Sequence, residues 1–164
     1  MIAVTDYFPA AAAIVLEAEG VFSDDASDPG GETVYGIARK SHPNLSPWPP
    51  TKDQAIAIYR ADYWDAHRCG EMPWQFALAV FDGEINQGSV IKALQTALAL
   101  RADGVVGEAT LHSMTYASAE ESLNLFFAAR AMAYIALPGF PIYGKGWLKR
   151  LMNVRGQAAI TPAV

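Results

Sequence analysis

The chain has 164 residues, of which 52% are hydrophobic and 18% charged, so it suits one compact domain or two small lobes and excludes a disordered protein. Its net charge of −5 excludes nucleic-acid binding through a strongly basic surface, and its single cysteine, Cys69, excludes an internal disulfide. The first 121 residues hold all 17 acidic and seven of the 12 basic residues, a net charge of −10, whereas the last 43 carry +5. This asymmetry favours an anionic partner for the tail, which is either an external surface or the protein's own acidic loop.

The first helix is expected from near Pro9 to Glu19, because proline suits the first helical position and Gly20 suits the position just past the end. The uninterrupted apolar run inside it, Ala10 to Leu16, is too short to span a bilayer. No Lys or Arg precedes that run, so we do not expect a signal peptide. The sequence by itself is therefore not expected to export the protein.

The remainder of the chain also predicts mainly helices. Two capping boxes, Thr51 to Gln54 and Ser118 to Glu121, mark helix starts, whereas HPNLSPWPP at residues 42–50 predicts a loop. Helices are expected over residues 35–42, 51–67, 74–87, 90–100, 108–115, from 118 to before 138, and 146–158. No alternating run is long enough for a proper sheet, although a short hairpin near Val34 fits the sequence. The predicted fold class is therefore mostly α.

The stretch from Glu19 to Ile37, EGVFSDDASDPGGETVYGI, combines residue types that suit glycoside hydrolysis. That reaction needs a carboxylic acid that stays protonated, and the negative end of a helix macrodipole raises the pKa of a carboxyl such as Glu19. Asp28 is either a rigid carboxylate across a cleft or only the cap of its Asp-Pro-Gly-Gly turn. Thr33 either holds a water or bonds to backbone. The competing acid, Glu17, points about 160° away from Glu19 on the helix.

Other polar and aromatic residues are candidates for binding a sugar. Asp82, Asn86 and Gln87 stand near the end of a predicted helix, where they suit the acetamido and hydroxyl groups of a glycan; alternatively, Asn86 caps the helix. Tyr35 and Trp48 suit stacking on sugar faces, although Trp48 suits a plug for the proline-rich loop equally well.

The sequence predicts no cofactor and no metal site. A zinc amidase would have to gather nearly all of His42, His67, His112 and Cys69, and only His67 and Cys69 stand close together in sequence. The acidic cluster before Pro29 lacks the ligand spacing and the final Glu of a regular calcium loop.

The Glu19 to Ile37 run closely resembles the EGG…DPGG.T.YGI signature of glycoside hydrolase family 108 endolysins, the N-acetylmuramidases of phages and prophages. A second block resembles the C-terminal peptidoglycan-binding region of that family: Phe81 to Gly88, Ala93 to Leu98, and Asp103 to Gly107 with Thr110. Together the two blocks cover nearly the whole chain. The resemblance implies a lysozyme-like helical fold, with a catalytic lobe over residues 1–73 packed as one compact unit with a peptidoglycan-binding region over residues 74–164.

The same resemblance implies cleavage of the β-1,4 bond between N-acetylmuramic acid and N-acetylglucosamine in peptidoglycan, with Glu19 as the catalytic acid. Asp28 and Thr33 resemble the rest of the Glu-x8-Asp-x5-Thr triad of other phage lysozymes, although the last gap here is four residues. A lytic transglycosylase and a catalytically inactive wall-binding or scaffold protein are the alternatives.

The last helix adds two further expectations. Gly146 to Arg150 resembles a Gly-Trp-x-x-Arg element of the family, whose arginine suits a pair with Glu19, and Arg155 lies on the apolar face, where it needs a carboxylate partner if buried. The basic helix suits an anionic bacterial envelope. The resemblance also implies a protein that is made in the host cytoplasm and reaches the wall by a holin-type route, and we expect it to be a monomer.

Overall fold

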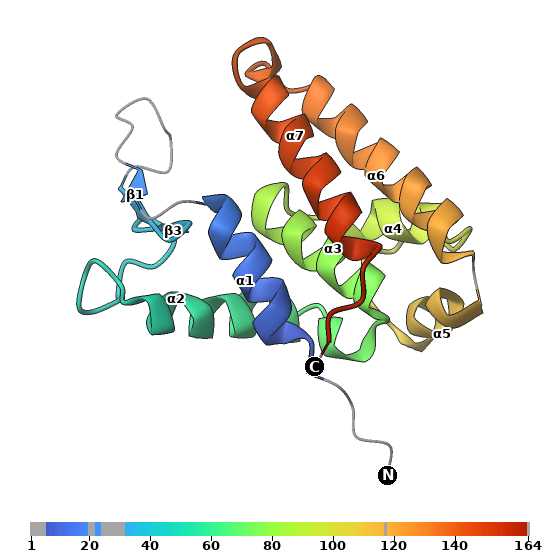
Figure 1. Ribbon diagram of the computed structural model, residues 1–164, viewed down its shortest axis with the longest axis horizontal. Coiled ribbons are helices and arrows are strands. Elements are labelled where there is room, and N and C mark those ends of the chain that lie inside the picture. The colour runs from blue at the N-terminus through green and yellow to red at the C-terminus, as the bar shows by residue number, and fades with distance from the viewer. Residues whose placement is uncertain (1–5, 20–21, 24–31, 117, 164) are drawn as a thin grey trace.

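The computed structural model describes residues 6–19, 22–23, 32–116 and 118–163, and for residues 17–19 and 22–23 it describes the backbone alone. Seven α-helices make up most of this part of the chain, so the predicted mostly α, lysozyme-like fold class is confirmed (Figure 1). The helices are α1 (Phe8–Glu19), α2 (Lys52–Tyr59), α3 (Trp74–Asn86), α4 (Ile91–Ala97), α5 (Glu108–Tyr116), α6 (Ala119–Ile135) and α7 (Phe140–Ala158). A π-helical segment, η1 (Arg60–Asp65), continues α2, and a short 3-10 turn, η2 (Cys69–Glu71), precedes α3.

Helix α3 is the central element of the core, and it packs against α1, α6 and α7 (Figure 1). Every residue from Phe76 to Glu84 is buried, so the helix has no solvated face over that stretch. A helix that is hydrophobic nearly all round must be surrounded by other elements, and here a single apolar cluster runs from Phe8 to Ala158. The proposed boundary between residues 73 and 74 falls immediately before α3. Because α3 packs against elements on both sides of this boundary, the division into two regions stays a prediction.

Aromatic contacts fix α1 against α3. The Tyr7 ring, immediately before α1, lies 5.5 Å from the Trp74 ring at an interplanar angle of 52°, and the Phe8 ring lies 5.9 Å from the Phe81 ring at 69°. Such inclined ring pairs combine apolar burial with favourable ring electrostatics. The small residues Ala11 and Ala12 are also buried, so the helix backbone approaches the core closely.

The chain that follows α1 forms a small antiparallel sheet of three two-residue strands, β1 (Phe22–Ser23), β2 (Thr33–Val34) and β3 (Ile37–Ala38). The expected hairpin near Val34 is thereby confirmed, and the expected helix over residues 35–42 is wrong. Tyr35 and Gly36 have positive φ values of 50° and 74°, which suit the two-residue turn of a β-hairpin. The turn therefore reverses the chain where the sequence pattern predicts a helix.

The predicted helix starts agree with the structure at α2 and α6. The Thr51 hydroxyl accepts from the Gln54 N–H, and the Gln54 side chain accepts from the Thr51 N–H, so this capping box is complete. At α6 only the Ser118 half of the predicted box forms. Helix α7 begins at Phe140, six residues before the expected Gly146, because Pro141 occupies its first turn, where proline is tolerated.

Helices α6 and α7 form an antiparallel pair that extends beyond the rest of the body (Figure 1). Arg155 of α7 is only partly buried, and it donates to the side-chain oxygen of Asn124, so the full burial that would require a carboxylate partner does not occur. Within the described ranges no helix is both long and apolar enough to cross a membrane.

Candidate functional site

Two of the predicted catalytic positions lie at the end of α1 and in the small sheet that follows it. Helix α1 ends at Glu19, and Ser23 of β1 pairs directly with Thr33 of β2. Paired residues of antiparallel strands have Cα atoms about 4.5–5.5 Å apart, so Thr33 lies beside the chain that leaves the helix end. Asp28 belongs to the connection between β1 and β2 and, like the Glu19 side chain, lies outside the described part. Thr33 itself is half-buried.

Contacts from outside the sheet hold the turn that follows Thr33. The Tyr59 hydroxyl of α2 donates to the Tyr35 carbonyl oxygen at 2.8 Å, and the whole Tyr59 residue is buried. A buried hydroxyl that bonds a turn carbonyl fixes the turn relative to the core. The positive φ of Tyr35 is therefore stabilised from α2.

The proline-rich loop supports the other side of the hairpin. The Arg39 guanidinium forms an ion pair with Glu32 at 3.2 Å and lies 5.4 Å from the centre of the Trp48 ring. The neighbouring Trp48 indole and the Arg39 guanidinium together lower the pKa of the Glu32 carboxyl, so this group is ionised at neutral pH. One face of the Trp48 ring is thus covered by Arg39, as expected of a residue that anchors the loop.

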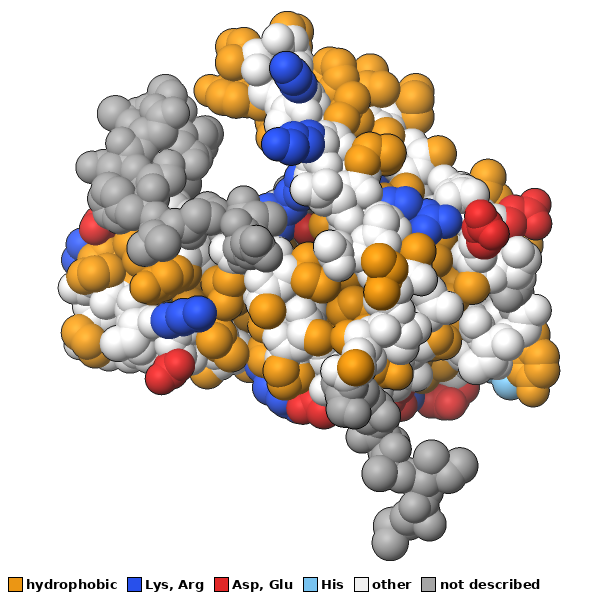
Figure 2. Space-filling model, viewed as in Figure 1, with side chains coloured by type: hydrophobic (Ala, Val, Ile, Leu, Met, Phe, Trp, Pro, Cys, Tyr) orange, Lys and Arg blue, Asp and Glu red, His pale blue; other side chains and the backbone are white. Residues whose placement is uncertain are grey.

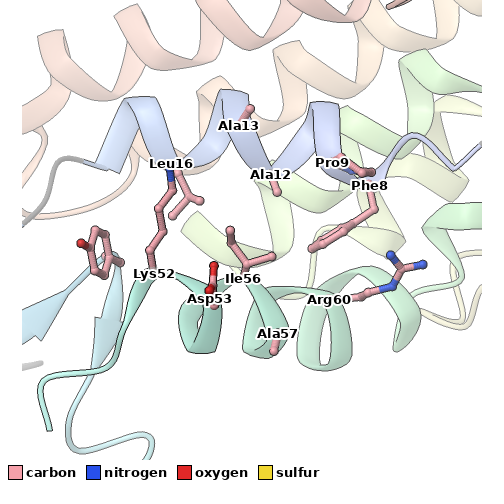
Figure 3. Close-up of a pocket in the computed structure, with 11 residues that line it drawn as sticks. Phe8, Pro9, Ala12, Ala13, Leu16, Lys52, Asp53, Ile56, Ala57 and Arg60 are labelled. Carbon is pink, nitrogen blue, oxygen red and sulfur yellow. The ribbon is translucent and has the colours of Figure 1, made fainter. Parts of the chain in front are cut away.

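A groove of about 890 Å³ runs between α1 and α2 and reaches the hairpin (Figure 3). Figure 3 shows Phe8 and Ile56 pointing into the space between the two helices, with the Lys52 side chain alongside Leu16. Tyr35, one of the predicted sugar-stacking residues, also lines this groove. An apolar groove with a few polar groups at its edges is typical of a ligand site.

The predicted sugar ligands on α3 belong to a buried charge network. Asp82 is 0% exposed; its Oδ2 accepts from Arg130 at 2.7 Å and its Oδ1 from Arg150 at 2.9 Å. The Asn86 side chain donates to the Asp82 carbonyl oxygen at 2.8 Å, and Gln87 both donates to the Arg130 carbonyl and accepts from its Nε. The direct sugar-binding role of these three residues stays a prediction, since their polar groups already bond within the protein.

The network joins three helices, because Asp82 lies on α3, Arg130 on α6 and Arg150 on α7. Arg130 is 1% exposed, and a fully buried arginine is tolerated only where acceptors surround it. Burial also raises the pKa of the neighbouring Tyr134 phenol, so its hydroxyl stays neutral. This pairing is not predicted from the sequence, although Arg130 stands within the apolar stretch Leu125–Ile135, which is the same signal that singled out Arg155.

Within the described ranges, no three His, Cys, Asp or Glu side chains lie close enough together to hold a metal ion. The Nδ1 of His67, one of the residues that a zinc site would use, donates to the Tyr63 carbonyl oxygen at 2.8 Å, and its Nε2 lies 3.5 Å from Glu84. Glu84 in turn accepts from the backbone N–H groups of Ser89 and Val90 at the turn between α3 and α4. His67 therefore contacts the glutamate that holds the turn between α3 and α4.

Two comparisons relate the chain to known proteins. The sequence model of the family described as Glycosyl hydrolase 108 matches residues 12–88, which cover most of α1 and all of the sheet, α2 and α3. The structure of SagA from Brucella abortus is similar over 93% of both chains, with a TM-score of 0.83 and 31% sequence identity. A search of curated proteins gives no match. Together with the helical fold and the position of Glu19, these similarities identify the chain as a member of the glycosyl hydrolase 108 family, a glycosidase family that acts on peptidoglycan.

Proposed function

We propose that the protein is an N-acetylmuramidase that hydrolyses the β-1,4 bond between N-acetylmuramic acid and N-acetylglucosamine, with Glu19 as general acid. The observation that carries this proposal is the strand pairing after α1. Glu19 is the last residue of the helix, and the Ser23–Thr33 pair returns the chain to that same end. This pairing supports a site in which the Glu19 carboxyl and the Thr33 hydroxyl act on one glycan beside the groove that Tyr35 lines.

In the proposed reaction, the Glu19 carboxyl donates its proton to the glycosidic oxygen while the bond from that oxygen to the sugar C1 breaks. The C-terminal end of α1 carries partial negative charge, which favours the protonated form of Glu19 before the reaction. A water oxygen then bonds to C1, and the proton that this water loses passes to a carboxylate, either Asp28 or the Glu19 carboxylate left by the first step. Asp28 orients this water or stabilises the positive charge on the sugar ring, and the Thr33 hydroxyl holds the water in place.

The groove between α1 and α2 is proposed to bind the glycan. Tyr35 is proposed to stack on a sugar face, because its ring lines the groove at the hairpin end. Asp82, Asn86 and Gln87 are proposed to support the site from within the α3–α6–α7 network, where their side chains bond.

The test is clearing of purified peptidoglycan by the wild type, Glu19→Gln and the matched control Glu17→Gln, which alters the same helix on another face. Circular dichroism and thermal melting establish that all three proteins are folded. Loss of the general acid is expected to reduce the rate roughly 100-fold to 10,000-fold, whereas Glu17→Gln should clear the wall at nearly the wild-type rate. If both variants clear it equally well, Glu19 is not the acid.

The products separate the muramidase from its alternatives. Mass spectrometry of the released fragments is expected to show hydrated reducing ends with N-acetylmuramic acid. Fragments that end in an anhydro-sugar would instead identify a lytic transglycosylase, in which Asp28→Asn should retain activity. Wall binding by the wild type without any released fragment would identify an inactive binding protein.

A further inference from the structure

The free end of the α6–α7 pair exposes a group of large hydrophobic side chains that the hydrolytic site does not use. Figure 2 shows hydrophobic side chains around this end of the molecule. The group, called here the apolar tip, consists of Met132, Ile135, Leu137, Ile142 and Tyr143, which are between 46% and 76% exposed. A contiguous apolar surface on a folded domain usually marks a site of interaction with a partner or a membrane.

The apolar tip is supported by ordered packing beneath it. The Trp147 ring stacks on Tyr134 at 5.2 Å and contacts Tyr143 at 5.8 Å, so these three aromatic residues bridge α6 and the first turns of α7. A Cβ at Gly144 would lie 2.6 Å from the Phe140 ring, so only glycine lets that ring pack on the helix backbone. The exposed side chains are therefore presented by a fixed scaffold.

Basic side chains flank the apolar tip on α7. Lys145 and Lys149 are exposed, four residues apart on one face of the helix, and neither forms an ion pair within the described ranges. Figure 2 shows blue side chains along α7 just below the hydrophobic end. No acidic residue follows Glu121 in the sequence, so the local charge on this part of the chain is entirely positive.

We propose that the apolar tip docks on the surface of an anionic phospholipid bilayer. Ile142, Tyr143 and their neighbours insert into the interface, and the two lysines bind lipid phosphates. Tyrosine suits this position, because its ring is apolar and its hydroxyl meets water or headgroups. The proposed contact is interfacial, because exposed apolar side chains and adjacent lysines suit the boundary between headgroups and acyl chains.

The same features argue against other occupants. Two copies meeting tip to tip would bring four lysines together without any carboxylate to offset their repulsion. A glycan needs several hydrogen-bonding groups, whereas the Tyr143 hydroxyl is the polar side-chain group of the apolar tip. The groove between α1 and α2 lies away from this end of α6 and α7, so a docked protein keeps that groove accessible (Figure 1).

The test is co-sedimentation of the full chain with vesicles of equal parts phosphatidylglycerol and phosphatidylcholine, compared with vesicles of phosphatidylcholine alone. The wild type is expected to bind the anionic vesicles and to release as salt rises to about 0.5 M. Ile142→Ser with Tyr143→Ser should lower the partition coefficient at least about tenfold, because less apolar surface enters the interface. Lys145→Gln with Lys149→Gln should lower it roughly 30-fold at low salt and remove the salt dependence.

Matched controls alter the same residue types elsewhere: Val105→Ser removes another exposed apolar side chain, and Lys92→Gln removes another exposed lysine. Both controls should bind vesicles as the wild type does, and circular dichroism establishes that every variant is folded. The double serine variant and the double glutamine variant are together called the tip variants. The proposal is overturned if both bind vesicles as the wild type does, or if the wild type binds the two lipid compositions equally. A concentration-dependent dimer that the tip variants abolish would assign the surface to a second copy instead.

The membrane contact and the hydrolytic activity are separable in the same experiment. The tip variants should clear purified peptidoglycan at the wild-type rate, and Glu19→Gln should bind vesicles as the wild type does. If the tip variants lose clearing in the absence of lipid, the apolar tip belongs to the glycan site and the membrane proposal is wrong. Failure of the muramidase proposal leaves the vesicle result unaffected.

Discussion

The α3–α6–α7 network and the hairpin beside α1 differ in how their polar groups are held in position. The network uses charges buried among three helices, with Asp82 paired to Arg130 and Arg150. The hairpin uses strands of only two residues each and depends on neighbours such as Tyr59 for its position. The difference teaches that the rigid framework and the proposed reactive groups are separate parts of the molecule. Substitutions in the network should therefore unfold the protein, whereas substitutions around the hairpin should change activity with less loss of stability.

The largest expected effect is that of Asp82→Ala, which leaves two arginines without their buried carboxylate. Removing one partner of a buried pair destabilises by about 3–5 kcal/mol, because the remaining charge stays desolvated. Urea unfolding followed by circular dichroism measures the change. The control, Asp62→Ala, removes an exposed carboxylate and should stay within about 0.5 kcal/mol of the wild type. Equal effects at the two positions would show that the network does not carry stability.

Gly83→Ala tests how closely the elements around the network approach one another. A Cβ at Gly83 would lie 2.7 Å from a Val90 methyl and 3.4 Å from the Arg130 guanidinium carbon. The overlap is expected to destabilise the protein by about 1–3 kcal/mol. At Gly146 in α7 no atom lies within 4 Å, so Gly146→Ala should instead stabilise by about 0.5–1 kcal/mol through helix propensity. Thermal melting of both variants measures this opposite pair of shifts, and shifts of the same sign would contradict it.

Tyr59→Phe tests whether the hairpin depends on its contact with α2. The substitution removes the hydroxyl that donates to the Tyr35 carbonyl, which should destabilise the protein by about 1 kcal/mol. Because the turn next to Thr33 then loses a constraint, kcat/KM on peptidoglycan should fall by more than the stability change explains. Tyr116→Phe, at an exposed tyrosine, serves as the control and should leave both quantities unchanged. If stability falls while activity stays constant, the contact serves folding alone.

The sequence predicts the helices well where local signals agree with packing. Thr51 with Gln54 marks the start of α2, and Gly88, with a φ of 62°, ends the region of α3. It fails at residues 35–42, because Tyr-Gly at a hairpin turn lacks the usual Asn-Gly signal and the strands beside it are too short to show alternation.

Long-range charge pairs are equally hard to predict. The bond from Arg150 to Asp82 joins residues 68 positions apart, and no local pattern selects one acidic partner among the 17 in the chain. The sequence did indicate that an arginine on an apolar helix face needs an acceptor. That reasoning applied to Arg130, which is fully buried, more than to Arg155, which stays partly exposed and bonds to an amide oxygen. How deeply each arginine is buried depends on tertiary packing, which the sequence pattern does not predict.

The smallest expected effect, Tyr35→Asn, distinguishes the two roles that Tyr35 combines. Asparagine tolerates the positive φ at this turn better than tyrosine, so stability should rise by a few tenths of a kcal/mol. If the ring stacks on a sugar in the groove, its loss should raise KM up to about tenfold with little change in kcat, since such stacking contributes about 0.5–1.5 kcal/mol. Tyr35→Phe keeps the ring and should leave KM unchanged. An unchanged KM in the asparagine variant would restrict Tyr35 to shaping the turn, and the glycan would then have to bind elsewhere along the edge where α1 ends.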